Sequence, residues 1–143
     1  MNLDQFGKLM HRRAKSLPEA VNKLKVRVAE AGLFSVVQHT PVDTGEAVSN
    51  WQVMNGAAAQ GTRPPFYPGE NRETMEQNQL AVLADAKKIF EAAKPGLPIH
   101  ITNNLHYIVD LEMGTSLQAP AGMLRGADVA MQFQLRNVKL LTE

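Results

Sequence analysis

The segment from Thr40 to Trp51 constrains the fold more than any other, and it reads Thr-Pro-Val-Asp-Thr-Gly-Glu-Ala-Val-Ser-Asn-Trp. Pro41 lacks a backbone N–H and disfavours the helical conformation at the residue before it, so a helix that precedes this segment must end here. The side chains of Asp43 and Thr44 can accept hydrogen bonds from downstream N–H groups, and Gly45 tolerates a positive φ. We therefore expect a tight turn that leads the chain from a helix into a sheet.

The residues after this turn predict a small antiparallel sheet. Polar and apolar side chains alternate from Val48 to Asn55, which is typical of a strand, and the single tryptophan, Trp51, is expected to anchor the core there. A second alternating segment covers residues 97 to 102, where Ile99 and Ile101 share one face. The two segments are expected to pair.

Helical periodicity accounts for most of the remaining chain. A first helix is predicted from Leu3 to Lys15, and the sequence Ser16-Leu17-Pro18-Glu19 has the spacing of a capping box that opens a second, long helix from Leu17 to Gln38. Further helices are predicted over residues 73–93, over 107–113 with Gly114 closing the helix, and over 121–138 with Pro120 at its start. The sequence thus predicts an α+β fold, a small antiparallel sheet packed against a long N-terminal helix and further helices.

Residues 56–72 contain three prolines and three glycines and show no periodicity. A proline-rich loop of this length in a compact domain is usually functional or disordered. Phe66 and Tyr67 lie among the prolines and are flanked by Arg63 and Arg72, so the loop is a candidate for docking against a neighbouring subunit. We expect it to be mobile in the free subunit. A floppy insertion without a role is the alternative.

Composition limits the class of protein. A chain of 143 residues, with 44% hydrophobic and 20% charged residues, is expected to form one domain over residues 1–143. No apolar run is long enough to cross a membrane, and the first residues lack the apolar core of a signal peptide. The absence of cysteine excludes disulfides and fits assembly in a reducing cytoplasm.

Charge is distributed unevenly along the chain. Residues 1–27 hold seven Lys and Arg against two acidic residues, a balance of 7 − 2 = +5, whereas the remainder holds 15 − 7 = 8 basic and 14 − 2 = 12 acidic residues, a balance of −4. The basic N-terminal segment, residues 1–16, carries Lys8, Arg12, Arg13 and Lys15. These side chains are candidates for contact with DNA or with the acidic surface of a neighbouring subunit, and a solvated helix end is the alternative.

No arrangement of residues in the sequence predicts an active site. The four histidines lack the spacing of a metal site beside a carboxylate, there is no phosphate-binding glycine loop, and no cofactor is expected. Asp43-Thr44-Gly45 is also the tripeptide of aspartic proteases, in which two carboxylates share a proton. That alternative requires an apolar strand before Asp43, where this sequence predicts a helix. We therefore expect a protein without enzymatic activity.

Several short motifs occur together in a fixed order. Pro41-Val42-Asp43-Thr44-Gly45 is followed by Asn50-Trp51, then by Asn103-Asn104-Leu105-His106-Tyr107, by Leu111-Glu112-Met113-Gly114-Thr115-Ser116, and by Gln118-Ala119-Pro120-Ala121-Gly122-Met123. In this combination the chain resembles the tail-completion and neck proteins of tailed bacteriophages, the family that includes the lambda minor tail protein Z. The resemblance covers residues 17 to 138, and His106 departs from it, since proline is common at that position.

The resemblance implies a structural protein of the virion. Such subunits form a ring, with six- or twelve-fold symmetry expected here, at the head–tail junction, where they join the tail to the head and surround the DNA channel. It implies contacts with neighbouring tail-terminator, tail-tube or connector proteins, and it carries over no catalytic residue. A tail-terminator or a head–tail connector ring is the alternative within this class.

Overall fold

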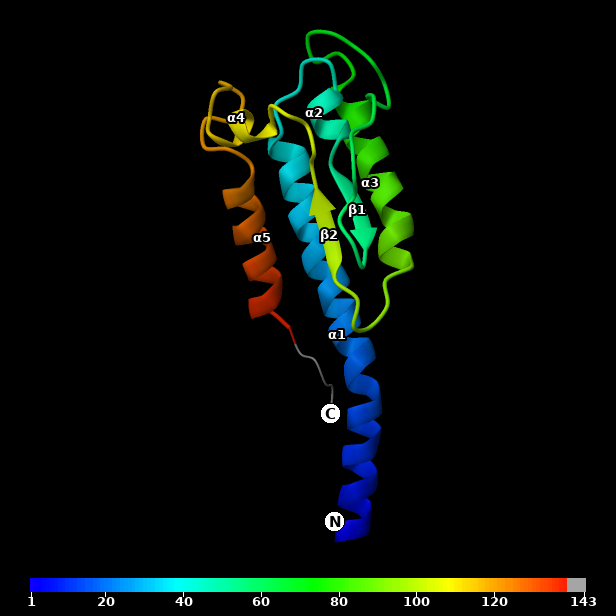
Figure 1. The fold of residues 1–143 in the computed structure, drawn as a ribbon. Coiled ribbons are helices and arrows are strands. Elements are labelled where there is room, and N and C mark those ends of the chain that lie inside the picture. Colours follow the sequence, from blue (N-terminus) through cyan, green and yellow to red (C-terminus); the bar gives the residue numbers. More distant parts are fainter. Residues whose placement is uncertain (139–143) are drawn as a thin grey trace.

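The structure, a computed structural model, describes residues 1–138 and confirms the predicted α+β class. Figure 1 shows the long helix α1 at the centre, with α5 on one side of it and the sheet and α3 on the other. In chain order the elements are α1 (Leu3–His39), α2 (Glu46–Ser49), β1 (Gln52–Asn55), α3 (Met75–Glu91), β2 (Ile99–Thr102), α4 (Ile108–Glu112) and α5 (Leu124–Arg136).

Helix α1 is continuous, so the predicted break at residues 16–19 is wrong. The capping box lies at the start of the helix instead, where the side chain of Asn2 accepts a hydrogen bond from Gln5 N, and Gln5 Oε1 accepts one from Asn2 N. Pro18 lies inside the helix, where it removes the hydrogen bond to the carbonyl of Ala14. Ala14 is exposed, so water can solvate the freed carbonyl, and the helix continues to His39.

The first half of the predicted strand from Val48 to Asn55 is also wrong. Residues 46–49 form the single helical turn α2, and the strand begins only at Gln52. Gly45 has a φ of 88°, as predicted, and its carbonyl accepts a hydrogen bond from Ser49 N at 3.1 Å. Val48 and Trp51 are both buried, which is the i, i+3 spacing of a helical turn and not the alternation of a strand.

The two strands pair antiparallel as predicted, with Val53 opposite Ile101 and Asn55 opposite Ile99. Trp51 is 6% exposed and belongs to a single cluster of buried side chains that α1, α3, α5 and the sheet share. Its indole N–H donates to Thr40 Oγ1 at 2.7 Å, across the turn that Pro41 opens. The predicted anchoring role of the tryptophan is confirmed.

The later helices lie where the sequence predicts them, with shorter ends. On α3 the buried face holds Asn78, Val82, Ala86 and Phe90, whereas Leu80, which we expected on that face, is 61% exposed. Gly114 follows α4 with a φ of 87°, as expected of a residue that closes a helix. Helix α5 begins at Leu124 and not next to Pro120, because residues 113–123 form a separate folded loop.

Candidate assembly surfaces

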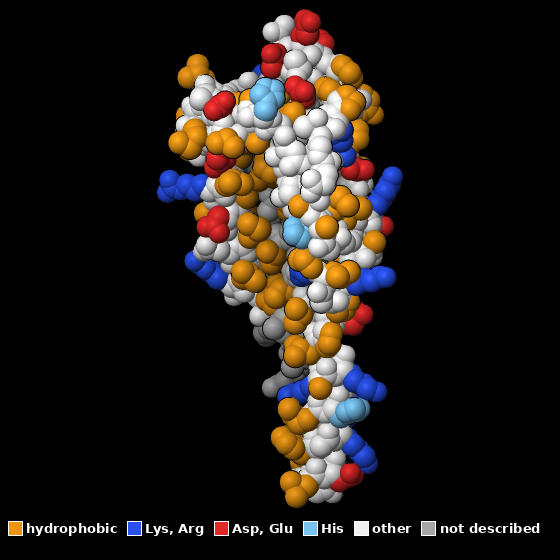
Figure 2. All heavy atoms as spheres, in the orientation of Figure 1, with side chains coloured by type: hydrophobic (Ala, Val, Ile, Leu, Met, Phe, Trp, Pro, Cys, Tyr) orange, Lys and Arg blue, Asp and Glu red, His pale blue; other side chains and the backbone are white. Residues whose placement is uncertain are grey.

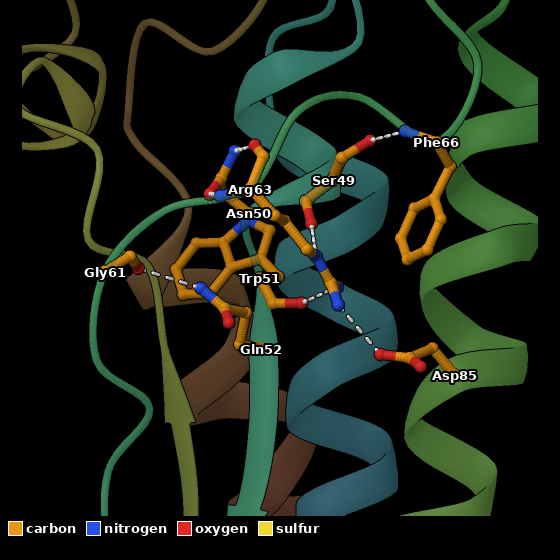
Figure 3. A network of polar contacts seen from close by, with 8 residues as sticks. All are labelled: Ser49, Asn50, Trp51, Gln52, Gly61, Arg63, Phe66 and Asp85. Atoms are coloured by element: carbon orange, nitrogen blue, oxygen red, sulfur yellow. Dashed lines mark hydrogen bonds and ion pairs between the residues drawn. The ribbon is translucent and has the colours of Figure 1, made fainter.

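One end of the molecule is a network of loops that polar side chains hold together (Figure 3). The buried amide of Asn50 binds both backbone groups of Arg63, donating to its carbonyl and accepting from its N–H, at 2.8 Å each. Asn50 Nδ2 also donates to Glu46 O at 2.9 Å, which closes the turn of α2. One side chain therefore fixes the middle of the 56–72 loop onto α2.

The guanidinium of Arg63 points into the subunit. It donates to the carbonyls of Ser49 and Trp51, forms an ion pair with Asp85 at 2.9 Å, and lies 4.4 Å from the ring centroid of Phe66. Charge-assisted bonds to carbonyls in a partly buried site are stronger than ordinary hydrogen bonds. We expected Arg63 to face a neighbouring subunit, and the structure places its charge inside its own subunit instead.

A second amide fastens the same loop to α3. Asn78 is fully buried, accepts from Tyr67 N at 2.9 Å and donates to Tyr67 O at 2.8 Å. Ser49 Oγ donates to the Asn78 carbonyl oxygen and accepts from Phe66 N. The backbone of Phe66 and Tyr67 is thus held against the subunit, contrary to our expectation of a mobile loop. Both side chains remain exposed, at 38% and 51%, so their predicted docking role stays a prediction.

Asp43 closes the other end of the loop. Its carboxylate accepts from Asn71 N at 2.9 Å and its carbonyl accepts from Arg72 N at 3.1 Å. Asn71 and Arg72 both have positive φ, 51° and 68°, a conformation that costs side-chain-bearing residues free energy and that these two bonds stabilise. We expected Asp43 to bond its own downstream backbone, and its partner is 28 residues away. Only Thr44 makes the local contact, to Glu46 N at 3.4 Å.

The motif around Glu112 fixes the start of α5. The Glu112 carboxylate accepts from Met123 N and Leu124 N, which supplies the cap that the first residues of α5 lack. Position 114 requires glycine because of its positive φ and also because a side chain has no room there. A Cβ would lie 2.3 Å from the carbonyl oxygen of Pro120. Gln118 completes this loop by binding both Val42 N and Val42 O, at 3.0 and 3.1 Å.

Tyr107 joins α4 to the Pro41–Gly45 turn. Its hydroxyl donates to Glu46 Oε2 at 2.8 Å. Burial, together with the hydrogen bond and the negative charge of Glu46, raises the pKa of Tyr107. The motif residues that the sequence singled out therefore lie in one structural network at this end of the molecule. Sequence reasoning missed Asn78, and it placed Gln118 in a motif without finding its partner Val42, which lies 76 residues away.

The opposite end of the molecule is a projecting helix, which we call the arm and define as residues 1–21. Figure 1 shows it extending beyond the other elements. Among the described residues, Asn22 is the first in α1 whose side chain donates a hydrogen bond to another part of the fold, to Ala93 O. Lys25 follows and donates to Lys94 O and Leu97 O. Large apolar side chains are exposed along the arm, namely Leu3 at 90%, Phe6 at 51%, Met10 at 46%, Leu17 at 39% and Val21 at 46%.

The arm has two distinct faces. Apolar residues recur along the arm at the 3.5-residue spacing of one helix face. They form two series with an interval of seven residues, Leu3, Met10 and Leu17, and Gly7, Ala14 and Val21. The two series lie side by side and make one apolar stripe. At 100° per residue, Lys8, Arg12 and Lys15 lie on the opposite face, and all three are exposed. Arg13 lies between the two faces and is partly buried. Three of the four predicted basic side chains, Lys8, Arg12 and Lys15, are therefore available on a surface that does not overlap the stripe.

Two apolar grooves flank the contact between α1 and α5. The sheet-side groove, of about 500 Å³, lies between α1, β2 and α5, and its lining includes Val21, Leu24, Ile99, Ile101, Met131 and Leu135. The aromatic groove, of about 920 Å³, lies between α1, α3 and α5, and its lining includes Phe34, Phe90, Val129 and Phe133. Figure 2 shows an apolar band that follows the sheet-side groove and continues onto the arm. Large exposed apolar surfaces of this kind mark sites of association.

Within residues 1–138 no group of acidic and histidine side chains is arranged to hold a metal ion. None of the described helices is long and apolar enough to cross a membrane. Comparisons of the chain with protein-family models, with curated proteins and with solved structures found no match.

Proposed function

We propose that the chain is a structural virion protein that forms a ring at the head–tail junction of a tailed phage, where it joins the tail to the head and surrounds the DNA channel. The observation that carries the proposal is the apolar stripe of the arm, which the other described residues, up to residue 138, leave exposed. Most of the stability of a protein helix comes from packing of its apolar face, so the arm is expected to gain stability from a partner that covers the stripe.

The two faces of the arm suit a subunit that lies beside a DNA channel. The apolar face can pack on protein while Lys8, Arg12 and Lys15 on the other face remain free to meet phosphates. The carboxylates that remain exposed elsewhere in the molecule, such as Glu70, Glu73 and Asp110, give the rest of the subunit its acidic character. A chain with this polarity can contact another copy or an acidic connector protein through opposite charges.

The motif that resembles phage neck proteins has a structural role in this proposal. Asp43, Gly45, Asn50 and Glu112 each hold a loop or a helix end in place, and they leave Phe66 and Tyr67 exposed on a fixed backbone. A fixed loop is a suitable contact for tail-terminator, tail-tube or connector proteins in adjoining layers, because little conformational freedom is lost on binding. The surroundings of Asp43 give no support to the protease alternative, since α1 and not a strand precedes it.

Native mass spectrometry of the purified protein at several concentrations tests the ring. We expect a discrete multiple of the 15.7 kDa subunit mass, six or twelve copies, that does not change with dilution over a tenfold range. A monomer at every concentration, or a ladder of masses without a preferred size, would contradict the proposal.

A further inference from the structure

The apolar stripe of the arm and the sheet-side groove form one continuous surface, and the groove can receive a helix. Its floor is α1 and its walls are β2 and α5, with Ile101 and Met131 half-buried and Leu135 55% exposed. The arm cannot fill the groove of its own subunit, because α1 is unbroken from Leu3 to His39 and carries the arm away from it. A helix in this groove must therefore come from another molecule.

We propose that two copies of the chain exchange arms, so that the arm of each subunit lies in the sheet-side groove of the other. This inference rests on the proposed function and deepens it, because it names the contact within a pair of subunits; a ring of six or twelve copies would then consist of such pairs, related by dihedral symmetry. The two α1 helices run antiparallel in such a pair, with the twofold axis near Leu17 and Val21, where the stripe of the arm meets the groove.

The surface area that the contact would bury favours a reciprocal exchange over the docking of a single arm. Residues 3–21 of the arm are about 28 Å long and a helix is about 10 Å wide, so one arm covers roughly 280 Å² and buries about 560 Å² on the two partners together. Stable interfaces bury at least about 1,000 Å². One arm falls short of this figure, whereas two exchanged arms reach about 1,100 Å².

Charge disfavours the simpler arrangement in which two arms pair with each other. The arm holds four basic side chains against two acidic ones, a balance of 4 − 2 = +2, so two adjacent arms would place like charges side by side, with Arg13 at the edge of each stripe. In the antiparallel exchange each arm lies instead in a groove whose lining is apolar except for one charged side chain, Lys25. The basic face of the arm, with Lys8 and Arg12, points away from the groove in this arrangement.

The register of the exchange follows from the packing of α5 on α1. Gly32 on α1 lies beside Met131, and Gly126 lies beside Ser35 and His39, so the two helices run antiparallel within a subunit. An arm that runs antiparallel to the α1 of its partner therefore runs parallel to α5 of that copy, with Met10 near Leu135 and Leu3 toward the Leu124 end of α5. The opposite orientation of the arm would bring Leu3 near Leu135.

The absence of native cysteine allows this register to be tested by cross-linking in the full-length chain. Single-cysteine variants are mixed in pairs and treated with a short bis-maleimide reagent. We expect dimers of mixed origin from Met10→Cys with Leu135→Cys and from Leu3→Cys with Leu124→Cys, and none from Leu3→Cys with Leu135→Cys. Val129→Cys is the matched control, because Val129 is 64% exposed on the same helix but lines the aromatic groove. Cross-links to Val129→Cys instead of Leu135→Cys would overturn the proposal.

A second variant tests the energetic role of the stripe. Leu17→Asp should raise the concentration at which the oligomer dissociates at least tenfold, because the exchange would bury an unpaired carboxylate. Ser16→Asp adds the same charge outside the stripe and should change this dissociation concentration less than threefold. Circular dichroism of both variants verifies that the helix is retained. Equal dissociation of both variants would overturn the proposal. The two proposals fail separately. A discrete ring without the cross-link between Met10→Cys and Leu135→Cys would refute arm exchange and leave the proposed function standing. Cross-linked dimers that never form a ring would support arm exchange and contradict the proposed function.

Discussion

The amide of Asn50 binds the backbone N–H and the backbone carbonyl of Arg63, so a single side chain pairs with residue 63 much as a neighbouring strand would. Asn78 pairs with Tyr67 and Gln118 with Val42 in the same way. Loops without regular structure are thus held by side-chain amides, which satisfy backbone groups that would otherwise be unpaired. The long loop owes its shape to these contacts and not to pairing with a strand.

Arg63 should contribute strongly to stability although it lies in a loop. Arg63→Lys removes the fork of donors that reaches Ser49 O, Trp51 O and Asp85, and we expect it to lower the free energy of unfolding by about 2 kcal/mol. Arg72→Lys is the matched control and should change it by less than about 0.5 kcal/mol, because Arg72 is exposed. Urea unfolding measures both values. Equal effects of the two substitutions would show that the loop is not held through Arg63.

Gly45 is required both by its backbone and by the space around it. Its φ is 88°, and a Cβ would lie 2.3 Å from Asn78 Nδ2, so Gly45→Ala should lower the free energy of unfolding by about 3 kcal/mol. Gly61→Ala provides the control, because Gly61 also has a positive φ, 75°, but has open space where the Cβ would be. We expect about 1 kcal/mol for Gly61→Ala. A smaller loss for Gly45→Ala than for Gly61→Ala in the same unfolding experiment would contradict the role of the Asn78 contact.

Tyr107 should make stability depend on pH in alkaline solution. Burial and Glu46 raise its pKa above the ordinary value of 10.0, so the unfolded chain loses this proton at lower pH than the folded chain does. The stabilisation is therefore complete below pH 10 and declines as the pH rises above it. Tyr107→Phe should reduce this decline in the melting temperature between about pH 9.5 and 11, whereas substitution of the exposed Tyr67 by Phe should not. Identical profiles for wild type and Tyr107→Phe would rule out the coupling.

The basic face of the arm is expected to bind DNA through phosphates. Replacing Arg12, Arg13 and Lys15 together by Gln should weaken binding to double-stranded DNA and reduce the slope of log K against log salt by up to about 3. Replacement of Lys87, Lys88 and Lys94 by Gln is the matched control, since these side chains are exposed on and after α3. Fluorescence anisotropy at several salt concentrations gives both slopes. The same slope for the two triple variants would mean that the arm acts only as a solvated helix end.

Local patterns in the sequence predicted most of the elements. Alternation at Ile99 and Ile101, the proline at 41 and the glycines at 45 and 114 act within a few residues, and the structure bears out what they predicted. The predicted start of β1 is too early, because the alternation of residue types from Val48 onward hides the i, i+3 spacing of the buried Val48 and Trp51, which belongs to a helical turn. Pro18 was read as a helix start, although the seven-residue spacing of Leu3, Met10, Leu17 and Leu24 continues across it and indicates an unbroken helix.

The network of side-chain amides could not be predicted from these patterns. The partners of Asp43 and Gln118 lie 28 and 76 residues away, and only the packing of α2, α3 and α4 brings them together. The sheet-side groove is likewise a product of three elements and leaves no periodic signal of its own. What the sequence did contain was the apolar stripe of the arm, which has no partner among residues 1–138 and therefore points to assembly.

The location of the chain in assembled particles tests the central claim most directly. Tailed-phage particles assembled with a copy of the chain tagged after Glu143 can be labelled with gold and imaged by electron microscopy. The account predicts label at the junction of head and tail in the particles, at a constant distance from the head. Label distributed along the tail or over the head, or particles that contain none of the chain, would contradict it.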